Sequence, residues 1–126
     1  MNRASAQLWQ HWADGRLCLQ RCVSCGRGQH PPGPVCSRCG STDVGFDDVT
    51  GPAELVAWST VRRAPSAAFA GEVPYTLVIA RVGSGALVEA RATDDGAADA
   101  WQVGAEVRLA LGEINGAALP VATVGG

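Results

Sequence analysis

The sequence predicts a mainly β protein in two parts: a short N-terminal helix with a cysteine-bearing ribbon, followed by a five-stranded barrel. Two observations predict this fold class. Four cysteines fall in two closely spaced pairs before residue 40, and the rest of the chain holds five short apolar runs bounded by glycine, proline or aspartate. With 126 residues, the chain has room for a metal-stapled module and a small β domain, but not for two large cores.

The first element that we expect is a short helix between Ser5 and Gly15. Ser5 can cap the first backbone amides, and Gly15 is placed to end the helix. Leu8, Trp9 and Trp12 fall on one side at helical spacing. Two tryptophans on so short a helix need burial, so we expect Trp9 and Trp12 to face a partner surface.

Two CxxC-Gly knuckles follow the helix, with ten residues between Cys25 and Cys36, and their thiols belong to Cys22, Cys25, Cys36 and Cys39. Two residues between thiols let both sulfurs reach one tetrahedral Zn²⁺ at about 2.3 Å. We therefore expect a closed structural zinc site that stabilises the fold and leaves no coordination position for water or substrate. Iron in a rubredoxin-type site is the alternative, but the region lacks the aromatic-rich small core expected for it, which favours zinc.

We divide the chain into an N-terminal helical segment, a zinc ribbon and a barrel domain, at residues 1–16, 17–47 and 48–126. The composition changes after Gly51-Pro52, which places the boundary between Val44 and Gly51. Cys18 lies in an alternating strand before the first knuckle, so we expect a small buried side chain there and not a reactive thiol.

The second part of the chain contains the five strands expected for a small barrel. They cover residues 53–62, 75–82, 86–92, 106–111 and 117–124. Gly83-Ser84-Gly85 suits a tight hairpin between the second and third strands. Five short strands in about 75 residues favour an OB-fold, although periodicity alone does not separate it from another five-stranded barrel.

The long loop between the first two barrel strands is apolar for a solvated connection. Loops of this length tend to be functional. Arg62 and Arg63 are suited to hold phosphate groups of a ligand, while Phe69 and Tyr75 cover its apolar portion. A loop that packs on its own barrel is the alternative.

Composition and motifs argue against several classes of function. The net charge is −2, and every basic residue is arginine, so general electrostatic attraction to nucleic acid is not supported. Zinc ribbons and OB-folds do serve as nucleic-acid-binding modules, and nucleic-acid binding stays the alternative function.

The sequence shows no nucleophile with a base placed beside it by a known motif, so we expect no catalytic residues. No run is long enough for a signal sequence or membrane span, which predicts a cytoplasmic protein.

Taken together, the motifs resemble the acyl-CoA-associated proteins that join an N-terminal zinc ribbon to a C-terminal OB-fold. The resemblance extends along almost the entire chain. The segments that carry it are the tryptophan helix ending in Gly15-Arg16-Leu17, Leu19-Gln20-Arg21-Cys22, Gln29-His30-Pro31-Pro32, Val35-Cys36, Gly40-Ser41-Thr42-Asp43, Arg63-Ala64-Pro65, Phe69 and Val73-Pro74-Tyr75.

This resemblance implies a non-catalytic accessory subunit that binds a thiolase-superfamily enzyme and helps to form its acyl-CoA site. Such partners include thiolases, lipid-transfer-protein-like aldolases that act on steroid side-chain acyl-CoA thioesters, and hydroxymethylglutaryl-CoA synthase. The implied assembly is a heterotetramer built on the partner's dimer. The residues expected to contact acyl-CoA or the partner are Trp9, Trp12, Arg62, Arg63, Phe69 and Tyr75.

Overall fold

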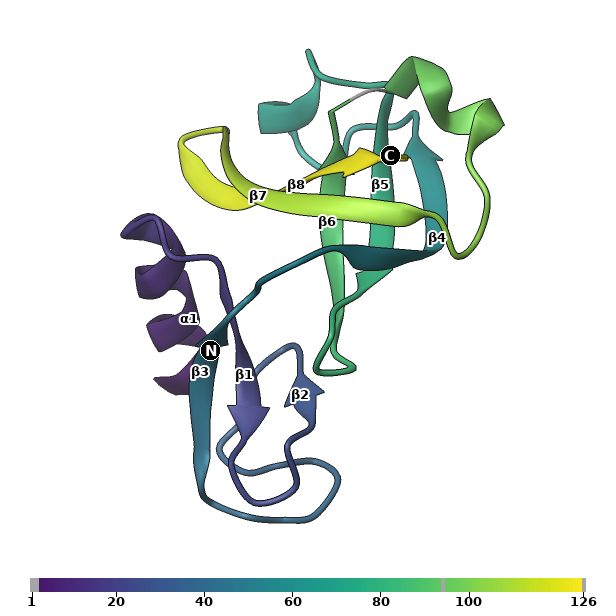
Figure 1. The fold of residues 1–126 in the computed structure, drawn as a ribbon. Helices are drawn as coiled ribbons and strands as arrows, with labels where there is room; N and C mark the ends of the chain where they lie inside the picture. Colours follow the sequence, from purple (N-terminus) through teal and green to yellow (C-terminus); the bar gives the residue numbers. More distant parts are fainter. Residues whose placement is uncertain (1–2, 94, 126) are drawn as a thin grey trace.

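The computed structural model describes residues 3–93 and 95–125, so Met1, Asn2, Asp94 and Gly126 of the predicted segments lie outside the described residues. A single α-helix packs beside a small three-stranded antiparallel sheet with the strand order β2-β1-β3 (Figure 1). The elements of this part are α1 (Arg3–Ala13), β1 (Cys18–Cys22), β2 (Gly28–Gln29) and β3 (Val44–Asp48).

The second part is a closed five-stranded barrel with the strand order β4-β5-β6-β8-β7, as the sequence predicted for an OB-fold. Its third and fifth strands run parallel and meet where Arg91 pairs with Val121. The seventh strand runs to Ile114, past the predicted end at residue 111, because its hairpin ladder with β8 continues to the turn. The elements are β4 (Ala53–Val61), η1 (Ala67–Phe69), β5 (Tyr75–Arg81), β6 (Leu87–Ala92), η2 (Asp95–Ala100), β7 (Glu106–Ile114) and β8 (Ala117–Val124).

The helix, the ribbon and the barrel share one hydrophobic core. Leu8 and Trp12 of α1 and Cys18 and Leu19 of β1 are buried in the same cluster as the inward-facing barrel residues. The indole Nε1–H of Trp12 donates a hydrogen bond to the carbonyl oxygen of Cys18 at 2.9 Å, which satisfies its only polar atom. The prediction that Cys18 is buried is confirmed, since none of its surface is exposed.

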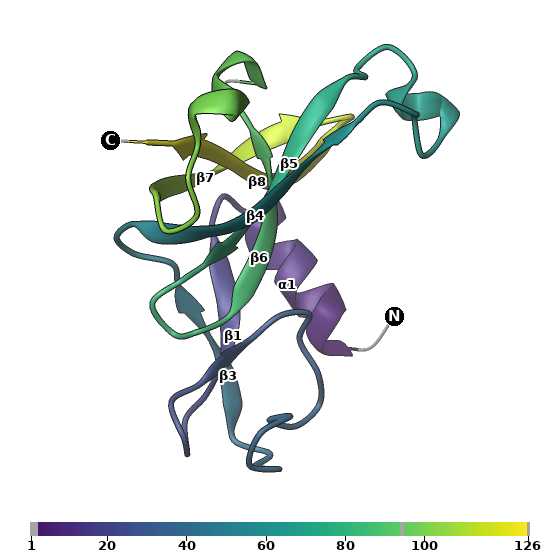
Figure 2. The same cartoon turned by 90° about the vertical axis from the view of Figure 1, so that its right-hand side faces the viewer.

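A second contact joins the ribbon to the hairpin turn between β5 and β6, which extends from the barrel toward the ribbon in Figure 2. The backbone N–H of Gly28 in β2 donates to the carbonyl oxygen of Ser84 in that turn at 2.9 Å. A Cβ atom at Gly28 would lie only 2.0 Å from Ser84 Oγ, so the close approach requires glycine. The predicted hairpin is confirmed, and its tip is also a ribbon contact.

Candidate functional site

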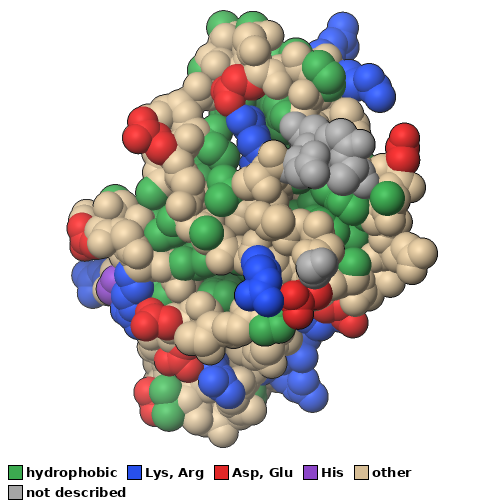
Figure 3. Space-filling view, turned by 45° about the horizontal axis from the view of Figure 1, so that its top comes forward, with side chains coloured by type: hydrophobic (Ala, Val, Ile, Leu, Met, Phe, Trp, Pro, Cys, Tyr) green, Lys and Arg blue, Asp and Glu red, His purple; other side chains and the backbone are tan. Residues whose placement is uncertain are grey.

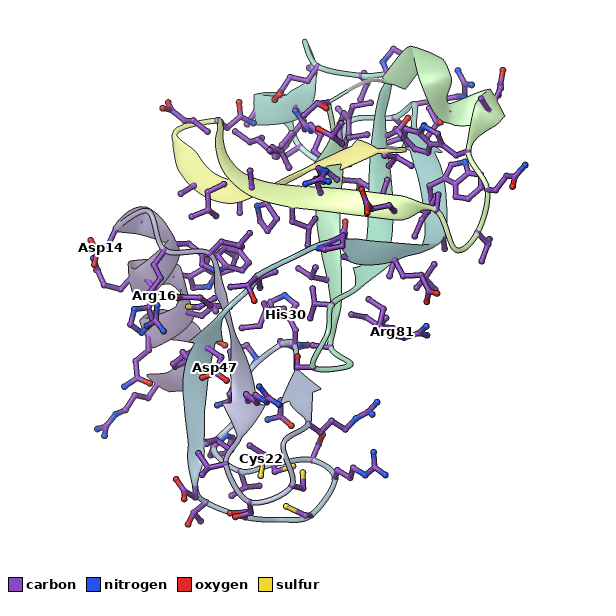
Figure 4. The ribbon with its side chains drawn as sticks, in the orientation of Figure 1. Asp14, Arg16, Cys22, His30, Asp47 and Arg81 are labelled. Atoms are coloured by element: carbon purple, nitrogen blue, oxygen red, sulfur yellow. The ribbon has the colours of Figure 1, made fainter. Side chains whose placement is uncertain are left out.

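Four thiols gather at the end of the ribbon that lies farthest from the barrel (Figure 4). Their sulfur atoms all lie within 4.8 Å of one another, and the closest pairs are Cys22 with Cys39 at 3.6 Å and Cys25 with Cys36 at 3.7 Å. Sulfurs bound to one tetrahedral Zn²⁺ at about 2.3 Å lie about 3.8 Å apart. The four cysteines are therefore positioned to bind a single metal ion of that size.

The knuckle backbone points its amides at the thiols. The N–H groups of Cys25 and Arg38 approach the sulfurs of Cys22 and Cys36 at 3.4 Å. Amides of Cys39 and Arg38 lower the pKa of the Cys36 thiol to about 6, which favours the thiolate that a metal requires. At Cys39 the Ser41 amide lowers the pKa, but hydrogen bonds with the other thiols outweigh it and raise the pKa to about 11.

The glycine that follows each knuckle makes this arrangement possible. Gly26 and Gly40 have φ angles of 79° and 78°, in the left-handed region that favours glycine. Their amides donate back to the carbonyl oxygens of Cys22 and Cys36 at 2.9 Å, which closes each turn around its thiols. The repeated CxxC-Gly motif therefore encodes two turns of the same geometry.

Two glutamines fix the loop that connects the knuckles. The buried Gln20 side chain donates to the carbonyl oxygen of Gly33 at 2.8 Å and accepts from the Gly33 amide at 2.9 Å. Gln29 in turn donates to the Gln20 amide oxygen, and its own Oε1 accepts the Ser37 amide at 2.8 Å. This network sets the second knuckle opposite the first.

The other candidate site is a pocket of about 310 Å³ between α1, the ribbon and the barrel, which we call the aromatic pocket. It lies over the outer face of β5 and β6, the second and third barrel strands, which is the face that OB-folds use for ligands. Apolar side chains gather around a hollow on the face seen in Figure 3. The pocket is lined by Trp9, Trp12, His30, Phe69, Tyr75, Leu77, Glu89, Ala90, Arg91, Ile114, Leu119 and Pro120.

Ring contacts define the walls of the aromatic pocket. On one side, Trp9 packs edge-on against Trp12 at 5.1 Å between ring centroids, and Trp12 stacks on His30 at 5.9 Å. On the other side, Phe69 lies 6.2 Å from Tyr75. In Figure 4, the labelled His30 side chain lies where the ribbon meets the barrel. Burial lowers the pKa of His30, which favours the neutral imidazole.

A largely buried ion pair holds the long loop onto the pocket wall. The guanidinium of Arg91 lies 4.0 Å above the Tyr75 ring and 5.8 Å from the Phe69 ring. It also donates to the carboxylate of Glu72, and these side chains are only 16% and 31% exposed. The positive charge of Arg91 on the barrel face is therefore neutralised by Glu72 of the same chain.

The structure brings four of the six predicted contact residues into the aromatic pocket, namely Trp9, Trp12, Phe69 and Tyr75. Arg62 and Arg63 are exposed and are not among its lining residues. Trp12 is only 2% exposed, because the shared core supplies the burial that the sequence analysis assigned to a partner. Trp9, 43% exposed, is the tryptophan of α1 that is open to a partner.

Sequence reasoning missed three residues of this site. His30, which was named only as part of the segment Gln29-His30-Pro31-Pro32, lies against Trp12. Arg91 and Glu72 were not singled out, because they come from different elements and only the fold brings them together. The alternation of β6 could have placed Arg91 on the outer face, but nothing in the sequence identifies its partner.

In the described part of the chain, α1 is far too short and too polar to cross a membrane, and neither 3₁₀ helix is longer.

A ribbon with four clustered thiols that shares its core with an OB-fold barrel defines a class of two-module proteins. Within this class, the chain belongs to the ChsH2 family. The family's rubredoxin-like zinc ribbon domain matches residues 9–45, and its C-terminal OB-fold domain matches residues 47–112.

Two curated relatives are similar over part of the chain. A probable enoyl-CoA hydratase alpha subunit of Thermomonospora curvata is 32% identical over 85 residues, which cover 68% of this chain and 26% of that protein. A DUF35 domain-containing scaffold protein of Pyrococcus furiosus is 30% identical over 90 residues, which cover 71% of this chain and 65% of that protein. The matches thus span about a quarter and about two thirds of the two relatives.

Two solved structures share the architecture. A chain of the Ltp2-ChsH2(DUF35) aldolase superposes with a TM-score of 0.80 at 29% identity, covering 98% of this chain and 96% of that one. A DUF35-family protein of unknown function from Sulfolobus solfataricus gives a TM-score of 0.64 at 14% identity, covering 98% of this chain and 87% of that one. The second likeness concerns the fold alone.

Proposed function

We propose that this chain is a non-catalytic, zinc-binding accessory subunit of a thiolase-superfamily enzyme, and specifically of a lipid-transfer-protein-like aldolase that acts on acyl-CoA thioesters. The observation that carries the proposal is the similarity over nearly the whole chain to a chain of the Ltp2-ChsH2(DUF35) aldolase. The scaffold protein of Pyrococcus furiosus supports an accessory role. The metal in this proposal is zinc, and the assembly is a heterotetramer on the partner's dimer.

The charge distribution also favours this function over nucleic-acid binding. A single-strand groove on an OB-fold needs unpaired cations beside stacking aromatics. Here the arginine beside Tyr75 on the β5–β6 face is paired with Glu72, and Glu89 adds a negative charge to the same pocket. The aromatic side chains on this face therefore lack the cationic surroundings that phosphate requires.

In the proposed complex, Trp9, Phe69 and Tyr75 form the apolar part of the surface shared with the partner. Arg62 and Arg63 are exposed on the same long loop and contact the phosphate groups of acyl-CoA. The partner supplies the nucleophile and base, and steroid side-chain thioesters are the proposed substrate class. The zinc is scaffold, because four thiolates leave it no open position.

Co-expression with a thiolase-like enzyme from the same organism tests the proposal. We expect a stable complex on size exclusion that contains one zinc ion per copy of this chain. Reversing both charges with Arg62→Glu and Arg63→Glu should raise the KM for acyl-CoA about tenfold, since charged hydrogen bonds are among the stronger ones. Arg108→Glu is the control, because this arginine is 71% exposed on β7. Separate peaks for the two proteins would overturn the proposal.

A further inference from the structure

Glu89 brings a negative charge to the aromatic pocket that no cation of the described residues balances. It is exposed on β6 and lines the pocket, and it takes part in none of the ion pairs within the described part of the chain. Arg91, on the same strand, is paired with Glu72 instead. Burial lowers the pKa of His30, so this imidazole adds no positive charge at neutral pH. Two carboxylates and one guanidinium leave the site with one net negative charge.

The walls of the pocket suit a long side chain with a charged end. Trp9 is 43% exposed, and the half-buried Phe69 and Leu77 add apolar surface. Lysine and arginine bury their methylene stems along such surface while the charged head stays accessible. Indole is also the ring that attracts a cation most strongly. An exposed indole and a carboxylate in one pocket therefore favour a basic side chain as the occupant.

The opposite wall of the pocket contains an arrangement of this kind within the chain itself. There the guanidinium of Arg91 lies 4.0 Å from the centroid of the Tyr75 ring and pairs with the Glu72 carboxylate. Trp9 and Glu89 provide a ring and a carboxylate a second time, and both line the same pocket. The Arg91 contacts show which group such a pair accommodates, namely a cation that lies over the ring and beside the carboxylate.

The volume of the pocket limits what a partner can insert. The pocket measures about 310 Å³. A single turn of α-helix, about 10 Å across and about 5.4 Å tall, occupies about 420 Å³. The pocket therefore admits a side chain of a partner protein but not one of its helices. Because its walls come from α1, the ribbon loop and the barrel, one inserted side chain contacts all three parts of this chain.

We propose that the aromatic pocket receives one basic side chain, an arginine or a lysine, from the partner enzyme. The inference rests on the accessory role proposed above and adds the chemistry of one contact. The stem of the inserted side chain packs on Trp9 and Leu77, and its charge lies beside Glu89. The source is the partner enzyme, because Trp9, Phe69 and Tyr75 of the same pocket belong to the surface proposed for it.

Competition between two forms of the chain tests the inference in the assembled complex. Untagged wild-type chain and a tagged variant are co-expressed with the thiolase-like enzyme, and the ratio of the two forms in the complex is measured. We expect Glu89→Gln to be incorporated about tenfold less than wild type, because hydrogen bonds to charged groups are among the stronger ones. Glu113→Gln with the same tag is the control, since Glu113 is exposed on β7 and does not line the aromatic pocket.

Charge reversal identifies the occupant. Glu89→Arg should exclude the chain from the complex, and changing one basic residue of the partner to glutamate should restore it, whereas Glu113→Arg should be incorporated like wild type. Both positions are exposed, so the variants should fold normally, which their zinc content and NMR spectra check.

The possible outcomes separate this inference from the proposed function. If a complex forms and incorporates Glu89→Gln and Glu113→Gln equally, the pocket takes an apolar side chain and only this inference is overturned. It is also overturned if no exchange on the partner restores Glu89→Arg, or if the free chain self-associates through Glu89, since a second copy is then the occupant. Absence of any complex with the wild-type chain would overturn the proposed function as well.

Discussion

The ribbon and the barrel reach their structures by different physical means. The ribbon has a two-residue edge strand and few buried apolar side chains, so its thiols and the Gln20–Gln29 network do most of the ordering. The barrel closes its backbone hydrogen-bond ladder and fills its interior with valine, leucine and alanine. The comparison indicates that the ribbon is built around thiols positioned to bind a metal ion, whereas the barrel depends on apolar packing.

Trp12 and the aromatic pocket connect these two halves. Trp12 is buried against both, and the pocket walls come from α1, the ribbon loop and the barrel. A perturbation can therefore be chosen to affect the ribbon, the junction or the barrel face. The predictions that follow are ordered from the largest expected effect to the smallest.

The ribbon should be lost when one thiol is removed. Cys36→Ser deletes a ligand, and a structural zinc contributes on the order of 10 kcal/mol to the folding of a small domain. We expect zinc content to fall and NMR signals of residues 18–48 to collapse, while the barrel signals stay dispersed. Cys18→Ala is the control, because this buried cysteine lies outside the four-thiol cluster and the variant should keep its zinc. Full zinc content in Cys36→Ser would contradict the account.

The junction should be the next most sensitive place. Trp12→Ala removes a buried aromatic side chain that both halves share, and we expect it to cost about 3–5 kcal/mol of unfolding free energy. Urea denaturation followed by signals from each half measures this, and both halves should be destabilised. Trp9→Ala, on the same helix but 43% exposed, should cost only about 1 kcal/mol. A shift confined to one half after Trp12→Ala is the result that would argue against a shared core.

On the barrel, the burial of an ion pair should decide how much it contributes to the free energy of unfolding. Arg91→Met leaves the Glu72 carboxylate without its partner and should cost about 2 kcal/mol. Arg81→Met removes the Arg81–Glu54 pair, whose side chains are 50% and 52% exposed, and should cost less than about 1 kcal/mol. Double-mutant cycles at both pairs give the coupling energies. Equal coupling at the two pairs would show that the docking of the long loop does not rest on Arg91.

The smallest effect should come from pH. Burial lowers the pKa of His30 in the folded chain below its usual value of 6.5, so the unfolded chain binds the proton more readily. Stability should therefore fall as the pH drops below about 6.5, and the slope should end at the folded pKa. In His30→Gln, the midpoint of urea unfolding should depend less on pH in this range. An unchanged slope in the variant would mean that another group titrates there.

The features that sequence could predict were those encoded locally. Two CxxC-Gly knuckles specify thiol spacing and left-handed turns, and alternating apolar runs specify strands, so the metal ribbon and the barrel were both predicted. The burial of Trp12 was predicted, but not that the chain's own core supplies it, because helical periodicity identifies a buried face but not what covers it. The contacts of His30, Arg91 and Glu72 depend on residues far apart in the chain, and composition carries no signal for them.

Binding of the partner enzyme by zinc-loaded and metal-free chain tests the central claim most directly. If the metal orders the ribbon and the ribbon supports the shared surface, chelation should abolish the complex on size exclusion while the barrel keeps its dispersed NMR signals. Addition of zinc should restore the complex. Equal binding of the metal-free chain would contradict the account, because the barrel alone would then carry the interaction.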